Sequence, residues 1–287
     1  MRATFDDRQM QAVTDLLREV ADAEIRPRFG MLASHEIAQK SAVNDLVTIA
    51  DLETEKALAQ QLQQLFPGCA IIGEEAVAGD PTLLDTIGDA ELAFIIDPVD
   101  GTWNFANGVP MFATMVAAVR RGETLAAWIH YPMNNDTLAA VRGGGAWRVD
   151  APGQATRCQV SSRTRPEDMS GFMATTLFEP DHRLALATNQ MRLGGVTNYF
   201  CSAYEYRMLV TGARDFGLNG RLMPWDHAPG QLLHEEAGGH SALCDGRAYR
   251  PTLWDGPFLL APDRDSWAEL NALFARPNQA NPIYSAG

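Results

Sequence analysis

The sequence predicts a layered α/β protein, α+β in its first half and α/β in its second, from three observations. Hydrophobic residues make up 46% of the chain and charged residues 21%, which is a globular composition. Two helical stretches come before a run of neighbouring apolar strands, an order typical of α+β folds. After residue 156, helices and short strands alternate. The 287 residues allow one large domain or two that share a core.

Two helices are expected before the first strand. The first covers residues 5–26, has apolar residues at helical spacing, and has Thr4 as its expected N-cap. The second covers residues 51–65, repeats leucine at helical spacing, and ends where Pro67 and Gly68 interrupt the pattern.

Short apolar runs predict the strands that follow. In the first half the expected strands are residues 69–72, 92–96, 115–120, 125–130, 137–141 and 146–149, the middle two as a hairpin. In the second half we expect helices at 182–191, 202–210, 227–237 and 266–274, with strands at 216–218 and 258–260. A boundary within residues 151–156 divides the chain into an N-terminal α+β part, 1–153, and a C-terminal α/β part, 154–287.

Charge and cysteine usage exclude several classes of protein. The formal net charge of −13 repels nucleic-acid backbones, so a DNA- or RNA-binding protein is not expected. The sequence contains no run of 18 apolar residues, so no membrane span is expected, and the N-terminal residues do not resemble a secretory signal. The cysteines stand far apart without a CxxC pair, which favours reduced thiols in a cytoplasm; they are Cys69, Cys158, Cys201 and Cys244.

Acidic residues gather where apolar runs end. Residues 71–72 lead into Glu74 and Glu75, and residues 95–96 lead into Asp97, Pro98, Val99 and Asp100. Because Pro98 fixes φ and the following glycine permits a tight bend, both aspartates of this expected turn can point toward one spot, with the Val99 carbonyl between them. The first two acids taken alone are typical of a solvated turn, whereas the second group is less easily explained by structure.

Two further acids stand at helix starts. Asp226 fits the N-cap of the helix expected at 227–237, and Asp51 opens the helix at 51–65, so each also has a purely structural interpretation. If these acids converge, their mutual repulsion requires protons or cations. Carboxylate oxygens with a backbone carbonyl suit Mg²⁺ or Mn²⁺ rather than Zn²⁺, and a pair of such ions suits phosphoryl chemistry.

The motifs together resemble the inositol monophosphatase family. The resemblance rests on four segments in the family's order, from about residue 40 to residue 239: Asp45–Thr48 with Asp51, Ile72–Glu75, Ile96–Phe105, and Trp225–Asp226 with Gly230. It implies an alternating αβαβα sandwich of the inositol monophosphatase and sugar phosphatase type. It also implies a Mg²⁺-dependent, lithium-sensitive phosphomonoesterase, commonly a homodimer, that acts on a small phosphorylated metabolite. From the composition we expect a cytoplasmic protein with no nucleic-acid or membrane partner.

The resemblance also implies roles for individual residues. One Mg²⁺ would be held by Glu74, Asp97 and the Val99 carbonyl, a second by Asp97, Asp100 and Asp226, and a third, weaker ion by Glu74. Asp51 and Thr102 would activate the attacking water, and Glu75 would support them. The expected substrate contacts are Asp100, Gly101, Thr102, Cys201, Ser202, Ala203, Asn219 and Asp226.

Departures from the family pattern leave the substrate open. Cys201 replaces the glycine of a Gly-Ser/Thr-Ala step whose backbone usually contacts the substrate, and Asn219 stands where many inositol phosphatases have a glutamate. Inositol 1-phosphate is the leading candidate. The alternatives on the same metal core are histidinol phosphate, fructose 1,6-bisphosphate and 3′(2′),5′-bisphosphate nucleosides. A non-catalytic, metal-binding regulatory protein is the alternative of another class. Trp103 and Phe105 fit either the mouth of the site or the core beneath it.

Overall fold

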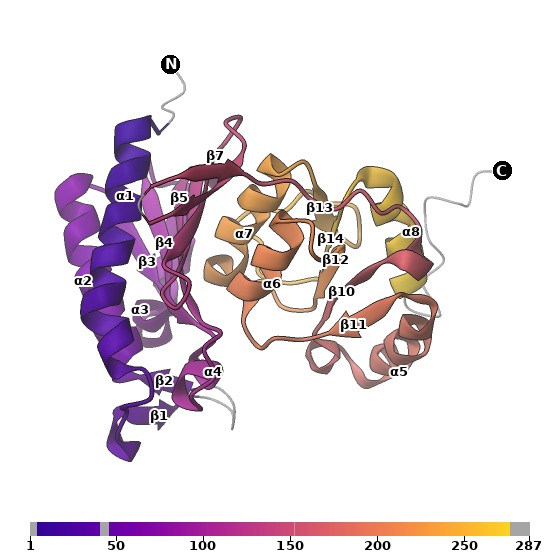
Figure 1. The fold of residues 1–287 in the computed structure, drawn as a ribbon, viewed down its shortest axis with the longest axis horizontal. Helices are drawn as coiled ribbons and strands as arrows, with labels where there is room; N and C mark the ends of the chain where they lie inside the picture. The colour runs from indigo at the N-terminus through magenta and orange to yellow at the C-terminus, as the bar shows by residue number, and fades with distance from the viewer. Residues whose placement is uncertain (1–4, 41–45, 152, 276–287) are drawn as a thin grey trace.

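The computed structural model describes residues 5–40, 46–151 and 153–275, and it has five layers. In Figure 1 these run from α1 and α2 through a first sheet, α6 and α7, and a second sheet to α5 and α8. The predicted layered αβαβα fold is therefore confirmed. The helices are α1 Asp7–Val20, α2 Ile49–Leu65, α3 Glu74–Gly79, α4 Thr102–Ala106, α5 Pro180–Asn189, α6 Ser202–Val210, α7 Pro224–Glu236 and α8 Arg264–Phe274.

The first sheet has seven strands in the order β3-β4-β5-β6-β7-β8-β9. Only β3 and β4 are parallel, and the others form an antiparallel meander that includes the predicted hairpin. Its strands are β3 Ala70–Gly73, β4 Ala93–Asp100, β5 Ala113–Arg120, β6 Glu123–Tyr131, β7 Asp136–Val141, β8 Ala146–Asp150 and β9 Ala155–Arg157. Two short strands, β1 Ile37–Gln39 and β2 Leu46–Thr48, pair separately.

The second sheet has five strands in the order β11-β10-β12-β14-β13. The parallel pairs β10–β11 and β10–β12 follow from the helix crossovers between them, whereas β14 is antiparallel to both β12 and β13. Its strands are β10 Ser170–Met173, β11 Gly195–Thr197, β12 Phe216–Asn219, β13 His240–Leu243 and β14 Phe258–Ala261.

Alternation along β4 decides which helices each side chain meets. Phe94 and Ile96 join the core cluster formed with α1 and α2 on one face, whereas Ile95 joins the cluster formed with α6 and α7 on the other. Because neighbouring residues of a strand point to opposite faces, Asp97 falls on the same face as Ile95. The buried sheet thereby directs one acid of the motif toward α7.

Helix caps differ from the sequence-based expectations in three places. The Thr4 cap lies outside the described residues, and Asp6 instead caps α1 by accepting a 2.8 Å hydrogen bond from the Gln9 amide. The second helix begins at Ile49, earlier than expected, because Thr48 is its N-cap. The expected cap Asp226 is the third residue of α7, which follows Met223.

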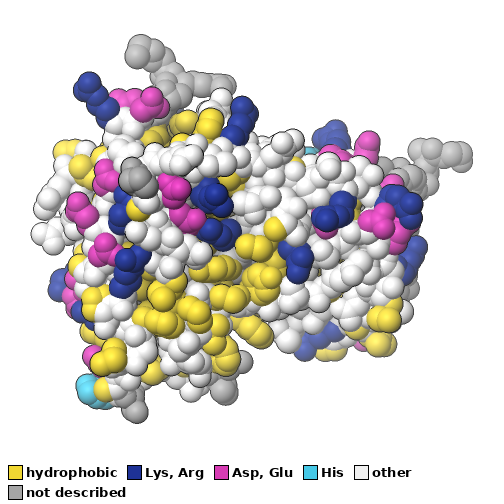
Figure 2. All heavy atoms as spheres, viewed as in Figure 1, with side chains coloured by type: hydrophobic (Ala, Val, Ile, Leu, Met, Phe, Trp, Pro, Cys, Tyr) yellow, Lys and Arg dark blue, Asp and Glu magenta, His cyan; other side chains and the backbone are white. Residues whose placement is uncertain are grey.

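Among the described residues, no helix has the length and apolar character needed to cross a bilayer. Figure 2 shows charged side chains of both signs around one face of the molecule and apolar side chains gathered near its middle.

Candidate functional site

The acidic motif Asp97–Asp100 lies within β4 and not in the turn that the sequence predicted. Its pairing with β5 is regular up to Asp97, which faces Met115, and then shifts so that Asp100 faces Ala113. Three steps along β4 therefore match two along β5. Residues three apart in a regular strand point to opposite faces, but the extra residue of this bulge brings both carboxylates to the same side.

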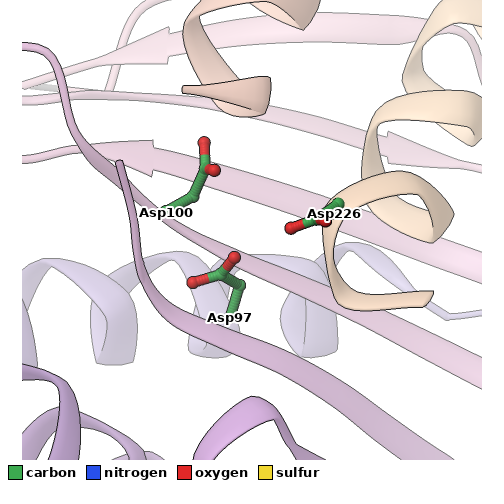
Figure 3. Close-up of side chains that lie close together, drawn as sticks. All are labelled: Asp97, Asp100 and Asp226. Atoms are coloured by element: carbon green, nitrogen blue, oxygen red, sulfur yellow. The ribbon is translucent and has the colours of Figure 1, made fainter. Parts of the chain in front are cut away.

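Asp97, Asp100 and Asp226 converge on one point. Figure 3 shows the first two extending from β4 and Asp226 reaching toward them from the first turn of α7. Each offers a carboxylate oxygen within 4.8 Å of the other two. Asp97 Oδ1 is buried and has no hydrogen-bond partner among the described residues. Burial, and then the neighbouring acids, raise the pKa of Asp97 and of Asp226 well above the usual value.

Asp100 also holds the N-terminus of α6. Its carboxylate accepts hydrogen bonds from the Cys201 thiol at 3.0 Å, the Ser202 amide at 3.2 Å and the Ala203 amide at 2.6 Å. Burial raises the pKa of Asp100 to about 6 although these donors oppose the shift. The amides of Ser202 and Ala203, two expected substrate contacts, are thus engaged by Asp100.

Gly101 allows the chain to leave this strand. Its φ of +88° is left-handed, and an added Cβ would lie 2.8 Å from the Met111 carbonyl oxygen and 3.2 Å from Cys201 Sγ. A side chain is excluded at this position on both counts. The residue that follows, Thr102, can therefore start α4 directly beside the acids.

Asp51 and Thr102, which the family resemblance implies as a pair that acts together, lie in contact. Thr102 Oγ1 lies 3.1 Å from Asp51 Oδ1 and 2.9 Å from the Val99 carbonyl oxygen, and its single proton can serve one of them at a time. The other Asp51 oxygen accepts hydrogen bonds from Thr48, at 2.8 Å from the amide and 2.6 Å from the hydroxyl. Burial raises the pKa of Asp51 to about 6, against the effect of the Thr48 hydrogen bonds.

Glu74 and Glu75 begin α3, where the sequence left a solvated turn open as an alternative. Lys40 Nζ lies 2.9 Å from Glu74 Oε1 and 2.5 Å from Glu75 Oε1, so this lysine partly neutralises both acids. Burial raises the pKa of Glu75 to about 7, although its hydrogen bond from Lys40 opposes the shift. Glu74 is close enough to raise the pKa of Asp97 but is not one of the three converging carboxylates. Asp45, the first residue of its motif, lies outside the described residues.

Three residues near the site were missed by the sequence analysis: Lys40, Glu55 and Glu205. Glu55 is buried and accepts 2.8 Å hydrogen bonds from the amides of Glu75 and Ala76, so this residue of α2 caps the N-terminus of α3. Its signal in the sequence is an acid four residues after Asp51, on the same face of one helix. The contacts of Lys40 and Glu205 depend on tertiary packing and have no such local signal.

Asn219, the other departure from the family pattern, lies beside Glu205. Asn219 ends β12, and together with Ser202 and Glu205 it lines a small cavity between α6 and the second sheet. Glu205 accepts a 3.0 Å hydrogen bond from the Tyr199 amide, and burial raises its pKa to about 8. This part of the site therefore contains a carboxyl group although residue 219 has none.

The aromatic residues after the motif separate into two roles. Phe105 is buried against Phe29 and Phe112, which is the core position that the sequence left open. Trp103 is partly exposed, and its ring centroid lies 5.8 Å from that of Phe200, the residue before Cys201. An aromatic pair thus flanks two segments of the site.

Comparisons with known proteins agree with this arrangement. The family model described as the inositol monophosphatase family matches residues 6–278. An inositol-1-monophosphatase of Bacillus subtilis (strain 168) is 31% identical over 233 residues, 80% of this chain and 84% of that protein. The Nus factor SuhB of Pasteurella multocida (strain Pm70) is 29% identical over 233 residues, 78% of this chain and 80% of that protein.

The fold has a close match among solved structures. The crystal structure of the extragenic suppressor protein suhB from Bartonella henselae gives a TM-score of 0.79 at 25% identity, covering 94% of this chain and 100% of that one. With the family model spanning nearly the whole sequence, the resemblance drawn from the acidic motifs is confirmed: the chain belongs to the inositol monophosphatase family, a family of phosphoric monoester hydrolases.

Proposed function

We propose that the protein hydrolyses a small phosphomonoester with the help of Mg²⁺, and that inositol 1-phosphate is its leading substrate. The observation that carries this proposal is the convergence of Asp97, Asp100 and Asp226 at a point largely closed to solvent. Unpaired carboxylates at such a place repel one another and lose hydration. A structure that keeps three of them together is suited to a cation.

The residues at this point fit a hard divalent cation. The converging side chains offer only oxygen, and Asp97 Oδ1 has no hydrogen-bond partner among the described residues. Oxygen donors favour Mg²⁺, with Mn²⁺ as an alternative, because Zn²⁺ sites in proteins generally include nitrogen or sulfur. Burial and mutual repulsion raise the pKa values of Asp97 and Asp226, and a bound cation would offset both effects.

Two or three ions are proposed, with the ligand sets that the family resemblance implies. Glu74, Asp97 and the Val99 carbonyl would hold one ion, and Asp97, Asp100 and Asp226 would hold a second. Glu74 would also contribute to a third, weaker site, where Lys40 now contacts it. Such ions neutralise phosphate oxygens and lower the pKa of water.

Asp51 and Thr102 are proposed to orient the attacking water and to accept its proton. Thr102 Oγ1 contacts both the Asp51 carboxylate and the Val99 carbonyl, so it joins the proposed base to a proposed metal ligand. A carboxylate whose pKa is raised to about 6 is a stronger base than an exposed aspartate and is still ionised near neutral pH. Glu75, held by Lys40, would support this arrangement from α3.

Substrate contacts are proposed on the segments around α6. Asp100, Gly101 and Thr102 lie at the end of β4 and the start of α4, and Cys201, Ser202 and Ala203 lie at the start of α6. Asn219 and Glu205 offer an amide and a carboxyl group that can hydrogen-bond to substrate hydroxyls. This favours a polyol phosphate, while histidinol phosphate, fructose 1,6-bisphosphate and 3′(2′),5′-bisphosphate nucleosides remain alternatives on the same metal core.

The proposal is tested by phosphate release from these four kinds of phosphoester, with Mg²⁺ and with EDTA. We expect hydrolysis only with Mg²⁺, the highest kcat/KM for inositol 1-phosphate, and inhibition by LiCl. Asp51→Asn should lower turnover by roughly 10²- to 10⁴-fold while Mg²⁺ binding, measured by calorimetry, persists. Preferred turnover of another phosphoester would reassign the substrate, and turnover that is unaffected by EDTA would refute the metal-assisted reaction.

A regulatory role is the second candidate, and the similarity to a protein named Nus factor SuhB favours it. On this alternative the chain binds metal without turning over any of the phosphoesters. The intact Asp51–Thr102 contact supports the enzyme, because a scaffold does not require a group that activates water. Mg²⁺ binding with no phosphate release from the whole panel would favour the regulatory protein.

We also propose that two copies of the chain associate. Large apolar side chains are exposed on the described surface, including Phe200 at 63% and Met133 at 46%, and Trp103 pairs with Phe200 there. Contiguous apolar patches are typical of protein interfaces, and Figure 2 shows apolar side chains gathered on one face of the molecule. Light scattering after gel filtration tests the homodimer, which a monomer mass of 31.4 kDa would refute. The division at residue 153 and the cytoplasmic location stay predictions.

A further inference from the structure

A second cavity opens at the far end of α7 from Asp226. It has a volume of about 530 Å³, and its walls are the ends of β5, β6 and β7, the last turns of α7, the start of β13 and the loop at 248–251. Asp226 and Glu235 are nine residues apart on one helix, which corresponds to ~13 Å at about 1.5 Å per residue. The cavity contains none of the proposed metal ligands, and its size is that of a site for a small molecule.

Arginines outnumber acids around this cavity. Arg120, Arg142 and Arg250 line it, with Glu123 and Glu235 as the acids, which leaves one positive charge in excess although the whole chain has a net charge of −13. Among the described residues, no carboxylate lies within 4.0 Å of the Arg120 guanidinium, whose Nε donates a 2.9 Å hydrogen bond to the Glu91 carbonyl. Arg120 follows Val119, whose side chain packs under α7, so the Arg120 side chain leaves β5 on the opposite face and is not the anion anchor of the cavity.

The other two arginines are held by long and exposed ion pairs. Arg142 Nη1 lies 3.4 Å from Glu235 Oε2, and Arg250 Nη2 lies 3.7 Å from Glu123 Oε1. Exposed pairs of this kind contribute at most about 1 kcal/mol to stability. An anionic group of a ligand can therefore exchange with these carboxylates at small cost.

Polar side chains also line the cavity, namely Thr124, Gln231, Ser241 and Tyr249. The oxygens Thr124 Oγ1 and Tyr249 Oη are themselves enclosed by protein atoms and have no hydrogen-bond partner in the described parts of the chain, so they are not open to a ligand. Thr124 pairs with Val119, whose side chain packs in the core cluster under α7, and cross-strand partners share one face of a sheet. The Thr124 side chain is therefore on the cavity side of the sheet. Close by, the Gln231 amide donates a 3.2 Å hydrogen bond to Ser241 Oγ.

We propose that this cavity binds a small metabolite that has a phosphate or carboxylate group together with hydroxyl groups. Arg142 and Arg250 each have a planar guanidinium that can bind either anion through two parallel hydrogen bonds. Ser241 and Gln231 provide partners for the ligand's hydroxyl groups. This site is separate from the acidic cluster and does not depend on the proposed hydrolysis.

Calorimetric titration of the metal-free protein tests the proposal. With EDTA present, the acidic cluster stays negative and repels anions, so binding of an anionic probe reports on another site. The probes are glucose 6-phosphate, AMP and malate. Comparing the binding of the two phosphates, glucose 6-phosphate and AMP, with that of malate distinguishes phosphate recognition from carboxylate recognition. We expect at least one of them to bind with a Kd below about 1 mM, which corresponds to ~4 kcal/mol.

Three variants locate the binding. Arg142→Gln should weaken binding at least tenfold, and Ala248→Trp should block the cavity from an exposed lining position. The control Arg165→Gln removes an exposed arginine whose partners, Glu167 and Asp168, lie elsewhere, and it should leave binding within twofold of wild type. All three should retain the circular dichroism of the wild type. Failure of every probe to bind, or equal weakening by Arg142→Gln and Arg165→Gln, would overturn the proposal.

Discussion

Replacing Asp51 with asparagine should make the protein more stable and far less active. Asp51 is fully buried, and its carboxylate accepts hydrogen bonds from Thr48 and from the Thr102 hydroxyl. Asparagine has the same shape, and its oxygen can keep both Thr48 hydrogen bonds. Its amide would then face Thr102, whose hydroxyl can accept from it and donate to the Val99 carbonyl.

The size of the effect follows from the pKa of Asp51. Burial raises this pKa from 3.8 to about 6, so the folded protein holds the proton more tightly than the unfolded chain does. The free energy of unfolding therefore falls as the pH rises from about 4 to about 6. At about 1.36 kcal/mol per pKa unit, a shift of roughly two units costs about 3 kcal/mol at pH 8, and roughly half of this cost is present at pH 5.

Urea unfolding in EDTA at pH 5 and pH 8 measures the difference. We expect the free energy of unfolding of Asp51→Asn to exceed that of wild type by about 1–3 kcal/mol at pH 8 and by less at pH 5, since asparagine has no charge to bury. Hydrolysis with Mg²⁺ should fall by roughly 10²- to 10⁴-fold, because the group that accepts the proton is lost. A variant that is less stable than wild type at pH 8, or one that keeps its rate, would refute this reasoning.

A buried aspartate with a different partner gives the matched control. Asp136 is bound by Arg207 through two contacts of 2.7 Å, far from the acidic cluster in the sequence. Asp136→Asn leaves the Arg207 charge without its partner, so it should lower the free energy of unfolding by about 3–5 kcal/mol at both pH values. Both substitutions replace aspartate with asparagine. Because the two carboxylates have different environments, the changes in the free energy of unfolding are expected to have opposite signs.

Three further results are expected. Mg²⁺ should raise the melting temperature more at pH 8 than at pH 5, because burial raises the pKa of Asp100 to about 6 and protons compete with the cation below that value; equal shifts in differential scanning fluorimetry would contradict this. Cys201→Val should lower the free energy of unfolding by about 1–3 kcal/mol at pH 8, whereas Cys201→Ser should lower it by less, since only serine keeps a donor to Asp100; urea curves that coincide would disprove the role of the thiol. Glu205→Gln should flatten the dependence of KM on pH between 7 and 9, because burial raises the pKa of Glu205 to about 8, and an unchanged pH profile would remove this residue from the substrate site.

The order of the elements was predictable because local patterns specify them. Helical apolar spacing predicted α6 at its observed bounds, and the apolar runs around residue 122 predicted the β5–β6 hairpin. The bulge in β4 was not predictable in this way. Proline and glycine near Asp97 and Asp100 favour a turn locally, yet pairing with β5 on one side keeps this segment in the sheet.

The site was predictable only as far as its acids are placed by strand ends and helix starts. Asp97, Asp100 and Asp226 could be proposed as a group only through the resemblance of their motifs to a known family, because the sequence pattern alone does not show that distant segments meet. Lys40 and Glu205 could not, because each reaches the site from a segment whose position depends on packing of the whole chain. Glu205 matters most among these, since the departure at Asn219 alone indicates a site without the carboxyl group that the structure provides.

The contact between α6 and α7 explains how acids from distant segments keep a common position. Asp100 binds the first amides of α6, and Tyr206 on that helix packs against Gly230 of α7, where an added Cβ would overlap its ring. Only glycine allows the two helices to approach this closely. Asp226 stands four residues before Gly230, about one turn along the same helix. The position of Asp226 is thus tied to that of Asp100 through a packing contact, and the glycine of this sequence motif has a structural function even though it carries no chemistry.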